Sequence, residues 1–384
     1  MALGMNALSQ YANRMNAGLE SECSGKRELA VDALRGFDMF WIIGGQKIFR
    51  SLDEVFHSST TGWISQQLDH AEWLGFTFYD VIMPLFLYLV GISMVFSFGK
   101  RLRNNPSRSL LWKHILVRVC WLWVLGMAVQ GKLLTYDIAQ IKLYSNTLQA
   151  IAAGYIIAAI LIIYLSPVRQ LIATVGLLAV YWAVFALVPV PGVGAGGAAP
   201  DGNMAIYIDK LVLGPFQDGT TYSWLLSSLN FGATTMLGVF TGYLLRSALT
   251  GKEKCAALGV TGVSLVALGI LWQFWHPLIK HLWTGSFVLF SGGLCLLLLA
   301  AFYYLMEIRG YRAWCSAFII IGSNAIFAYV SSHIFDFRLI AKVFIGGLEK
   351  YVGSWYPFML ALGGFLVLYL VLQVMYDKKI FIRI

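Results

Sequence analysis

Long apolar blocks separated by short polar loops set the pattern of this 384-residue chain. One of these blocks runs from Phe76 to Phe98 and contains a single acid, Asp80, and no base. A helix of that length crosses the apolar core of a bilayer. The blocks lack the period-two alternation of membrane β-strands, so the pattern predicts an all-α fold.

The same length criterion predicts about ten membrane-spanning helices. They cover residues 29–49, 76–98, 110–131, 147–165, 171–188, 223–245, 256–274, 284–306, 314–333 and 356–375. A half-span at 340–347 would raise the count to eleven. We therefore expect a polytopic membrane helical bundle, with residues 1–26 as a cytosolic tail and residues 27–384 as one transmembrane domain.

Composition and charge support a membrane protein and exclude a nucleic-acid binder. Hydrophobic residues make up 59% of the chain and charged residues 12%. The net charge of +9 comes from bases in loops that alternate along the chain, seventeen on one side against nine on the other. This is the asymmetry that sets membrane orientation, and it places both termini in the cytosol. His70 then faces the opposite side.

His70 is the first candidate for chemistry, because it lies in a polar loop that leads directly into the 76–98 span. A neutral imidazole held at a membrane boundary can take and return a proton as a general base. The alternative is a solvated interfacial histidine beside Asp69 and Glu72. Either acid neighbour, Asp69 or the later Asp80, is placed to orient the imidazole, and the sequence leaves the choice open.

Polar residues inside the spans form a second set of candidates. Asp32, Arg35 and Asp38 follow one another at intervals of three, so they share a helix face where they can pair. Gln149 and Asn324 lie in later spans, where amides commonly hydrogen-bond a neighbouring helix. Small residues such as Gly322 allow such helices to approach closely.

At these residues the chain resembles the heparan-α-glucosaminide N-acetyltransferase family and its bacterial relatives, within the transmembrane acyltransferases. The resemblance begins in the first span with RELAVDALRGFDMFWIIGG and continues through His70, Trp73, Gly75, Asp80, Pro84 and Gly91. Later segments follow in the family's order: LYSNTLQAIAAGY, YSWLLSSLNFGATTMLGVFTGYLL, HLWTGSFVLFSGG and FIIIGSNAIFAYV. It covers about Arg27 to Asp336.

The resemblance implies an enzyme that takes acetyl-CoA from the cytosol and acetylates an amino sugar, such as a glucosamine-type glycan, on the outer side. It matches His70 to the family's catalytic histidine, either as covalent acetyl acceptor or as general base. Gln46 and Asn324 are candidate donors or orienting groups for the oxyanion, and Asp80 for the imidazole. The candidate donor-binding residues are Arg35, Lys100, Arg101 and Gln149. Two positions differ from many relatives: Gln46 replaces an Asn, and Ala150 replaces a base.

Other interpretations of the sequence stay open at this stage. A small-molecule transporter also carries intramembrane Asp, Arg and Asn, although no half-to-half repeat is visible. A scaffold protein would make the histidine coincidental. The compact chain fits a bacterial plasma-membrane enzyme, with membrane lipids as partners and a homodimer as a compatible assembly. The five cysteines show no CxxC and no metal-ligand spacing, so no metal site is expected.

Overall fold

The structure is a computed structural model that describes residues 28–104, 107–131 and 137–382. Helices dominate these residues, and extended backbone pairs in them only at an isolated bridge between Val190 and Gly194. The all-α fold predicted from the hydrophobic pattern is confirmed. The predicted tail at residues 1–26 lies outside the described residues. By internal contacts the chain divides into two compact units.

Seven helical segments of the described chain are long and apolar enough to cross a membrane. They are Phe78–Gly99, Arg108–Val129, Thr147–Tyr164, Pro167–Leu187, Gly251–Trp272, Gly285–Ile308 and Phe337–Asp377. The pair Ala313–Ser323 and Ala325–Ile334, bent by 67°, raises the count to eight if it forms one broken span. The predicted spans 29–49 and 223–245 are also helical but more polar, the first through its charges and the second through Ser, Thr and Asn. The chain is an integral membrane protein.

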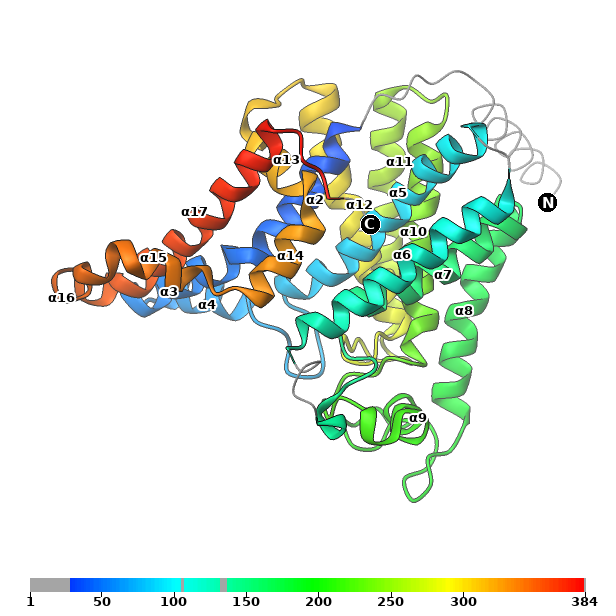
Figure 1. Ribbon diagram of the computed structural model, residues 1–384. Coiled ribbons are helices and arrows are strands. Elements are labelled where there is room, and N and C mark those ends of the chain that lie inside the picture. Colours follow the sequence, from blue (N-terminus) through cyan, green and yellow to red (C-terminus); the bar gives the residue numbers. More distant parts are fainter. Residues whose placement is uncertain (1–27, 105–106, 132–136, 383–384) are drawn as a thin grey trace. The chain divides into compact units, whose positions relative to one another are not determined.

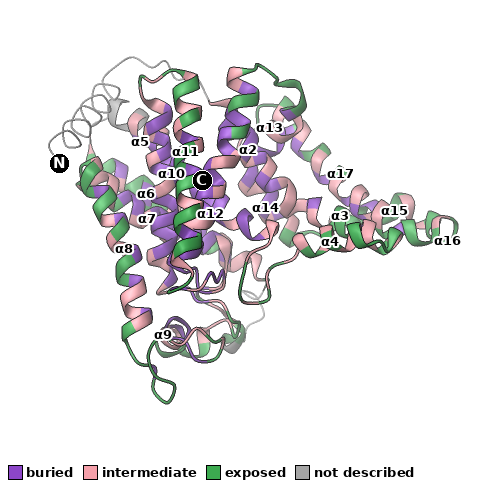
Figure 2. Ribbon diagram, turned by 180° about the vertical axis from the view of Figure 1, so that it is seen from behind, coloured by how far each residue is buried: buried purple, intermediate pink, exposed green. Residues whose placement is uncertain are grey.

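The first unit comprises residues 73–75 and 83–300. Its helices are α5 (Ile82–Asn104), α6 (Arg108–Val129), α7 (Thr147–Tyr164), α8 (Pro167–Leu187), α9 (Met204–Leu213), α10 (Ser227–Arg246), α11 (Gly251–Trp272) and α12 (Gly285–Tyr303). α10 packs against α7 and α8, and α6 packs against α7 (Figure 1). α5 and α10 are mostly buried, whereas α8 and α11 expose apolar faces suited to lipid (Figure 2).

Glycines bring α5 and α10 into direct backbone contact. A Cβ on Gly238 would lie 1.9 Å from the carbonyl oxygen of Tyr88, and a Cβ on Gly91 would lie 2.0 Å from that of Thr235. Any side chain at either glycine would therefore push the two helices apart. Close approach at small residues is how membrane helices gain packing contacts where lipid offers no hydrophobic driving force.

The second unit comprises residues 28–72, 76–82 and 301–382 of the described chain. Its elements are α2 (Leu29–Phe40), the π-helix η1 (Trp41–Gly45), α3 (Gln46–Phe56), α4 (Ser59–Gln67), η2 (Phe78–Val81), α13 (Ser316–Ser323), α14 (Ala325–Ile334), α15 (Phe337–Ile345), α16 (Glu349–Val352) and α17 (Tyr356–Asp377). α13 packs on α2, and α17 packs on α3, α13 and α15. A Cβ on Gly322 would lie 2.3 Å from the Asp32 carbonyl oxygen, which confirms the predicted close approach.

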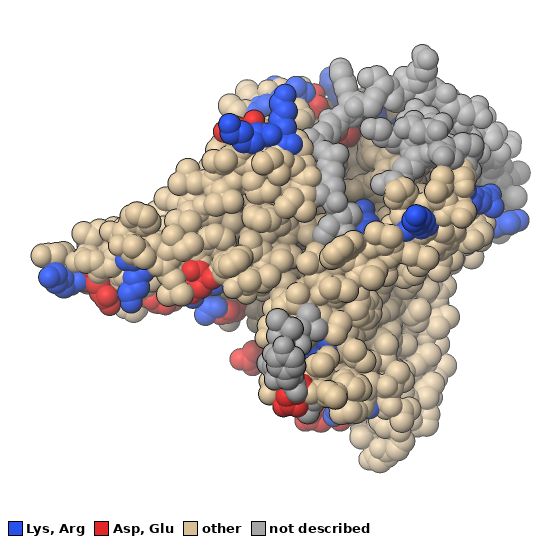
Figure 3. Space-filling view, in the orientation of Figure 1, with Lys and Arg blue, Asp and Glu red and all other residues tan. Residues whose placement is uncertain are grey.

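Charged side chains lie at the two ends of this second unit on the face seen in Figure 3. Between the end near α13 and the end formed by α3, α4, α15 and α16, the surface carries neither acids nor bases. An uncharged band flanked by charges is the distribution expected of helices that cross an apolar membrane core.

Candidate functional site

A short loop, residues 68–77, joins α4 to η2 and α5 and carries His70. Thr77 and Asp80 form a capping box around η2, the first turn ahead of α5. The N–H of Thr77 donates to Asp80 Oδ2 at 3.0 Å, and the N–H of Asp80 donates to the Thr77 carbonyl at 3.0 Å. The local sequence Thr-Phe-Tyr-Asp thus holds the Asp80 carboxylate at a helix N-terminus, where the helix dipole favours negative charge.

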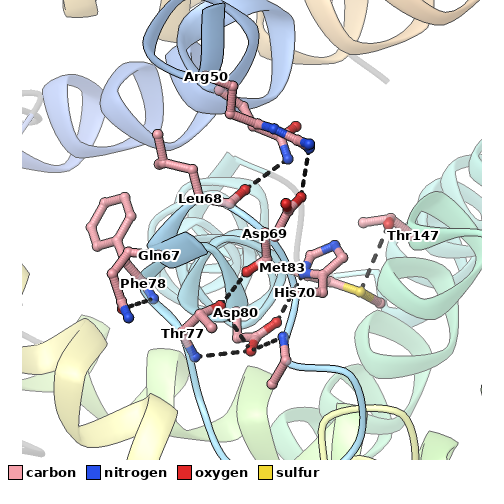
Figure 4. A network of polar contacts seen from close by, with 12 residues as sticks. Arg50, Gln67, Leu68, Asp69, His70, Thr77, Phe78, Asp80, Met83 and Thr147 are labelled. Carbon is pink, nitrogen blue, oxygen red and sulfur yellow. Dashed lines mark hydrogen bonds and ion pairs between the residues drawn. The ribbon is translucent and has the colours of Figure 1, made fainter. Parts of the chain in front are cut away.

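Asp80 also holds the imidazole of His70. The distance from His70 Nδ1 to Asp80 Oδ1 is 2.8 Å, and the Asp80 side chain is fully buried while that of His70 is 41% exposed (Figure 4). The other carboxylate oxygen accepts from the N–H groups of Ala71 and Thr77 and from the Thr77 hydroxyl. Because a carboxylate accepts, Nδ1 carries a proton and the lone pair of the neutral ring is on Nε2.

The two acids that the sequence left as alternatives have different partners. Asp69 Oδ1 pairs with Arg50 Nη1 at 2.6 Å, and both side chains are about half exposed. A surface ion pair of this kind contributes little to stability. Of the two acids, Asp80 is the one that hydrogen-bonds the imidazole of His70. The carbonyl of Asp69 accepts from the Thr77 hydroxyl, which ties the loop to the start of η2.

Gln46 lies at the histidine loop, at the start of α3 directly after the π-helix η1. Its side-chain amide donates to the carbonyl oxygen of Leu68, two residues before His70, at 2.7 Å. π-helical turns insert one extra residue and are frequent at functional sites. Gln46 therefore holds the backbone of the loop. The same amide nitrogen carries a second N–H, which can donate to another acceptor.

Arg35 lies midway along α2, and Asn324 lies between α14 and α13, which packs on α2. The Asn324 amide donates to the Ile380 carbonyl at 3.0 Å and accepts from the Ile382 N–H at 2.9 Å, so it joins the α13–α14 break to the segment after α17. Arg35 pairs with Asp32 at 2.9 Å. These hydrogen bonds of Asn324 and this ion pair of Arg35 are to residues other than His70.

The remaining residues predicted to bind the donor belong to the first unit. Gln149 is fully buried, and its amide donates to the Leu143 carbonyl and accepts from the Ser145 N–H at 2.7 and 2.9 Å. These bonds fix the turn before α7. Lys100 and Arg101 lie in the last turns of α5, and their side chains are outside the described part of the structure.

Tyr79 and Asp38 have surroundings that the sequence did not predict. The ring of Tyr79 packs on that of His70 with centroids 5.0 Å apart. Asp38 is fully buried in α2, and no hydrogen bond from the described residues reaches either of its carboxylate oxygens. Equal three-residue spacing made Asp32 and Asp38 equivalent partners for Arg35, but the rotamer selects Asp32. The position of Tyr79 directly before Asp80 was the only local signal for the ring contact.

The arrangement can move a proton or attack an electrophile. A fixed carboxylate on Nδ1 orients the ring, sets its tautomer and stabilises the imidazolium that forms when Nε2 takes a proton. The same lone pair on Nε2 can act as a nucleophile toward an activated carbonyl. Burial of Asp80 strengthens these electrostatic effects because less water screens the carboxylate.

Another buried acid, Asp209 of α9, organises a loop of the first unit. Its two carboxylate oxygens accept from the N–H groups of Trp224 and Leu225 at 2.6 and 2.9 Å, just before α10. Burial raises the pKa of Asp209 to about 6. The two N–H donors lower this pKa, and the charge of Asp218 raises it. Because the folded pKa is raised, the stabilisation from this group is complete below its ordinary value and is lost as pH rises through about 6.

We therefore expect the thermal stability of the protein to fall between pH 4.5 and 7 by an increment that Asp209→Asn removes. Asn cannot ionise, so the slope with pH should become shallower by on the order of 1–3 kcal/mol over that interval. Thermal unfolding of both proteins in detergent across this range measures it. Asp201→Asn, at an exposed loop position, is the control and should keep the wild-type slope. Equal slopes for wild type and Asp209→Asn would contradict the assignment.

Comparison with known proteins shows a distant relationship. No protein-family model matches the chain. Two curated proteins, from Homo sapiens and Mus musculus, each align with 23% identity over 328 residues and 70% of this chain. Both carry the name heparan-alpha-glucosaminide N-acetyltransferase. The alignment covers 49% of each relative, so the chain spans about half the length of the curated proteins that it matches.

Proposed function

We propose, from this distant relationship to two N-acetyltransferases, that the protein is a membrane-embedded acetyltransferase. It transfers an acetyl group from acetyl-CoA to the amine of an amino sugar. The observation that carries the proposal is the hydrogen bond between buried Asp80 and Nδ1 of half-exposed His70. His70 is the histidine that matches the family motif. The hydrogen bond holds its ring in the tautomer and orientation that a base or nucleophile needs.

Transfer of the acetyl group forms one bond and breaks another. The acceptor nitrogen bonds to the acyl carbon, and the carbon–sulfur bond breaks with its electron pair going to sulfur. Of the two protons that an ammonium acceptor loses, one ends on the coenzyme A thiol and the other is released. Nε2 of His70 either takes a proton from the attacking amine and returns it to the sulfur, or first carries the acetyl group itself.

The tetrahedral intermediate on either route needs fixed hydrogen-bond donors. Gln46 is our first candidate because its amide already contacts the histidine loop at Leu68. Asn324 is a weaker candidate, since both ends of its amide hydrogen-bond the backbone at residues 380 and 382. We assign Asn324 a role in positioning α13 and α14.

The uneven distribution of bases supports a sidedness in which both termini are cytosolic and His70 faces outward. The acyl donor is then supplied from the cytosol and the amino sugar is acetylated on the other side. A bacterial plasma membrane is the proposed location. The donor must pass its acetyl group across much of an apolar core about 30 Å thick.

The direct test incubates the purified protein with acetyl-CoA radiolabelled on the acetyl group, with and without glucosamine. Labelled N-acetylglucosamine together with released coenzyme A thiol is the expected result. Label that remains on His70 after denaturation without acceptor would identify the covalent route, and its absence alongside transfer would identify the direct route. Failure both to bind acetyl-CoA and to release thiol would overturn the proposal in favour of a small-molecule transporter.

A further inference from the structure

Arg118 lies deep inside a candidate membrane span, Arg108–Val129. All but two of the 28 lysines and arginines fall in predicted loops or near the ends of spans, and the exceptions are Arg35 and Arg118. Arg35 has Asp32 as its ion-pair partner. Arg118 follows Arg108, the first residue of α6, by ten residues, which places it about 15 Å along the helix. That is about half the thickness of an apolar core.

The described chain gives Arg118 an aromatic face but no anion. Its guanidinium carbon lies 4.6 Å from the ring centroid of Tyr155 on α7. Its Nε is buried, and no described residue accepts a hydrogen bond from it. A cation–π contact covers one face of the guanidinium and uses none of its in-plane N–H donors.

The neighbouring helices cannot supply a carboxylate. The sequences of α5, α6, α7, α8 and α10 contain no Asp or Glu. α6 packs on α7, which packs on α10 and α8, and the ring of Tyr155 meets that of Phe98 on α5. A guanidinium held among apolar helices without a counter-charge is costly, and residues of this kind commonly mark a ligand or ion path.

A second base of the same unit, Arg246, lies beside α5. Arg246 at the end of α10 donates from Nη1 to the Val95 carbonyl of α5 at 3.2 Å. A Cβ on Gly99 would lie 2.5 Å from that Nη1, so the glycine leaves room for the arginine beside α5.

We propose that Arg118 binds a phosphate group of the acyl donor's nucleotide, an inference that rests on the acetyltransferase function. The planar fork of a guanidinium matches phosphate oxygens, and the Tyr155 ring holds the fork in place. The anion comes from the pyrophosphate of coenzyme A and not from a phospholipid headgroup, because a headgroup lies at the membrane surface. A phosphate anchored halfway along a span leaves only about half of the apolar core for the acyl arm to cross.

The test compares ligand-induced thermal stabilisation of the full-length protein in detergent for wild type, Arg118→Gln and Arg108→Gln. The probes are coenzyme A, inorganic pyrophosphate and phosphatidylglycerol in mixed micelles. Arg118→Gln should weaken binding of coenzyme A and pyrophosphate by at least about tenfold, since charge-assisted hydrogen bonds to phosphate are lost. Arg108→Gln, an exposed position on the same helix, should change it less than about threefold.

Each other outcome overturns the site or separates it from the proposed function. Unchanged coenzyme A affinity in Arg118→Gln, no coenzyme A binding by wild type, or loss of phosphatidylglycerol binding alone would overturn the site. Coenzyme A binding that depends on Arg118 without acetyl transfer would keep the site and reject the function. If Arg118→Gln fails to fold, Arg118→Lys decides: it keeps a cation in α6 but loses the fork, so affinity should fall about fivefold, and unchanged affinity overturns the proposal.

Discussion

His70→Asn is expected to reduce acetyl transfer by about 10³-fold or more while the protein still folds and binds coenzyme A. Asparagine can place its amide N–H where His70 Nδ1 now donates to Asp80, so the buried carboxylate keeps a partner. What disappears is the lone pair on Nε2, which we propose takes a proton or an acetyl group. The loss should therefore fall on kcat and leave the affinity for coenzyme A nearly unchanged.

His57→Asn is the matched control for this variant. His57 is an exposed histidine of the same unit, at the end of α3, with φ of 45°. Asparagine tolerates this left-handed conformation, so the control should retain activity within about twofold. Steady-state transfer rates and coenzyme A-induced thermal stabilisation are measured for both variants. Turnover by His70→Asn near the wild-type rate would remove His70 from the chemistry.

The fold was predictable because the membrane requires long uninterrupted apolar helices. The 76–98 block appears as the segment Phe78–Gly99, and the 147–165 block as Thr147–Tyr164. Bends within these blocks were harder to predict: the 314–333 block is broken at Asn324 into two helices at 67°. The break depends on where the Asn324 amide finds partners, and these lie 56 and 58 residues later in the chain.

The sequence left Asp69 and Asp80 open as partners of His70, and a local turn decides between them. Thr77 and Asp80 form a capping box over three residues, and that turn selects Asp80 rather than Asp69 as the partner of His70. The contact of Gln46 with Leu68 joins residues 22 apart, and only the packing of the π-helix and the loop decides it. Sequence analysis named Gln46 as a candidate donor or orienting group, without naming its partner.

Arg118 illustrates a different limit of sequence analysis. A count of charges in alternating loops uses the bases outside the spans and passes over one inside. Arg118 was identified as a candidate anion-binding residue from its surroundings. The Tyr155 ring covers one face of its guanidinium, and the helices around it contain no acid. Its Nε is buried and has no acceptor among the described residues. Burial and hydrogen bonding therefore add information that hydropathy and charge counts do not contain.

Asp80→Asn is expected to lower acetyl transfer by on the order of 10²–10⁴-fold through the tautomer of His70. The N–H groups of Ala71 and Thr77 donate to one oxygen of the carboxylate, so the amide oxygen of the introduced asparagine must occupy that side. The NH₂ group of the same amide then faces His70 Nδ1 and donates to it. The imidazole proton moves to Nε2, and the nitrogen that should accept a proton carries one instead.

Asp69→Asn is the control, because Asp69 is the neighbouring acid of the loop and its side chain pairs with Arg50 at the surface. It should change the rate by less than about threefold, since exposed ion pairs contribute little. Asp80→Asn keeps the oxygen that caps η2, so its loss of folding stability should be about 1–2 kcal/mol and its coenzyme A affinity nearly unchanged. Transfer rates, thermal midpoints and ¹⁵N chemical shifts of the His70 ring nitrogens measure these effects. If the ring shifts show Nε2 still unprotonated in Asp80→Asn, or if Asp69→Asn loses as much activity, the carboxylate of Asp80 does not set the reactive form of His70.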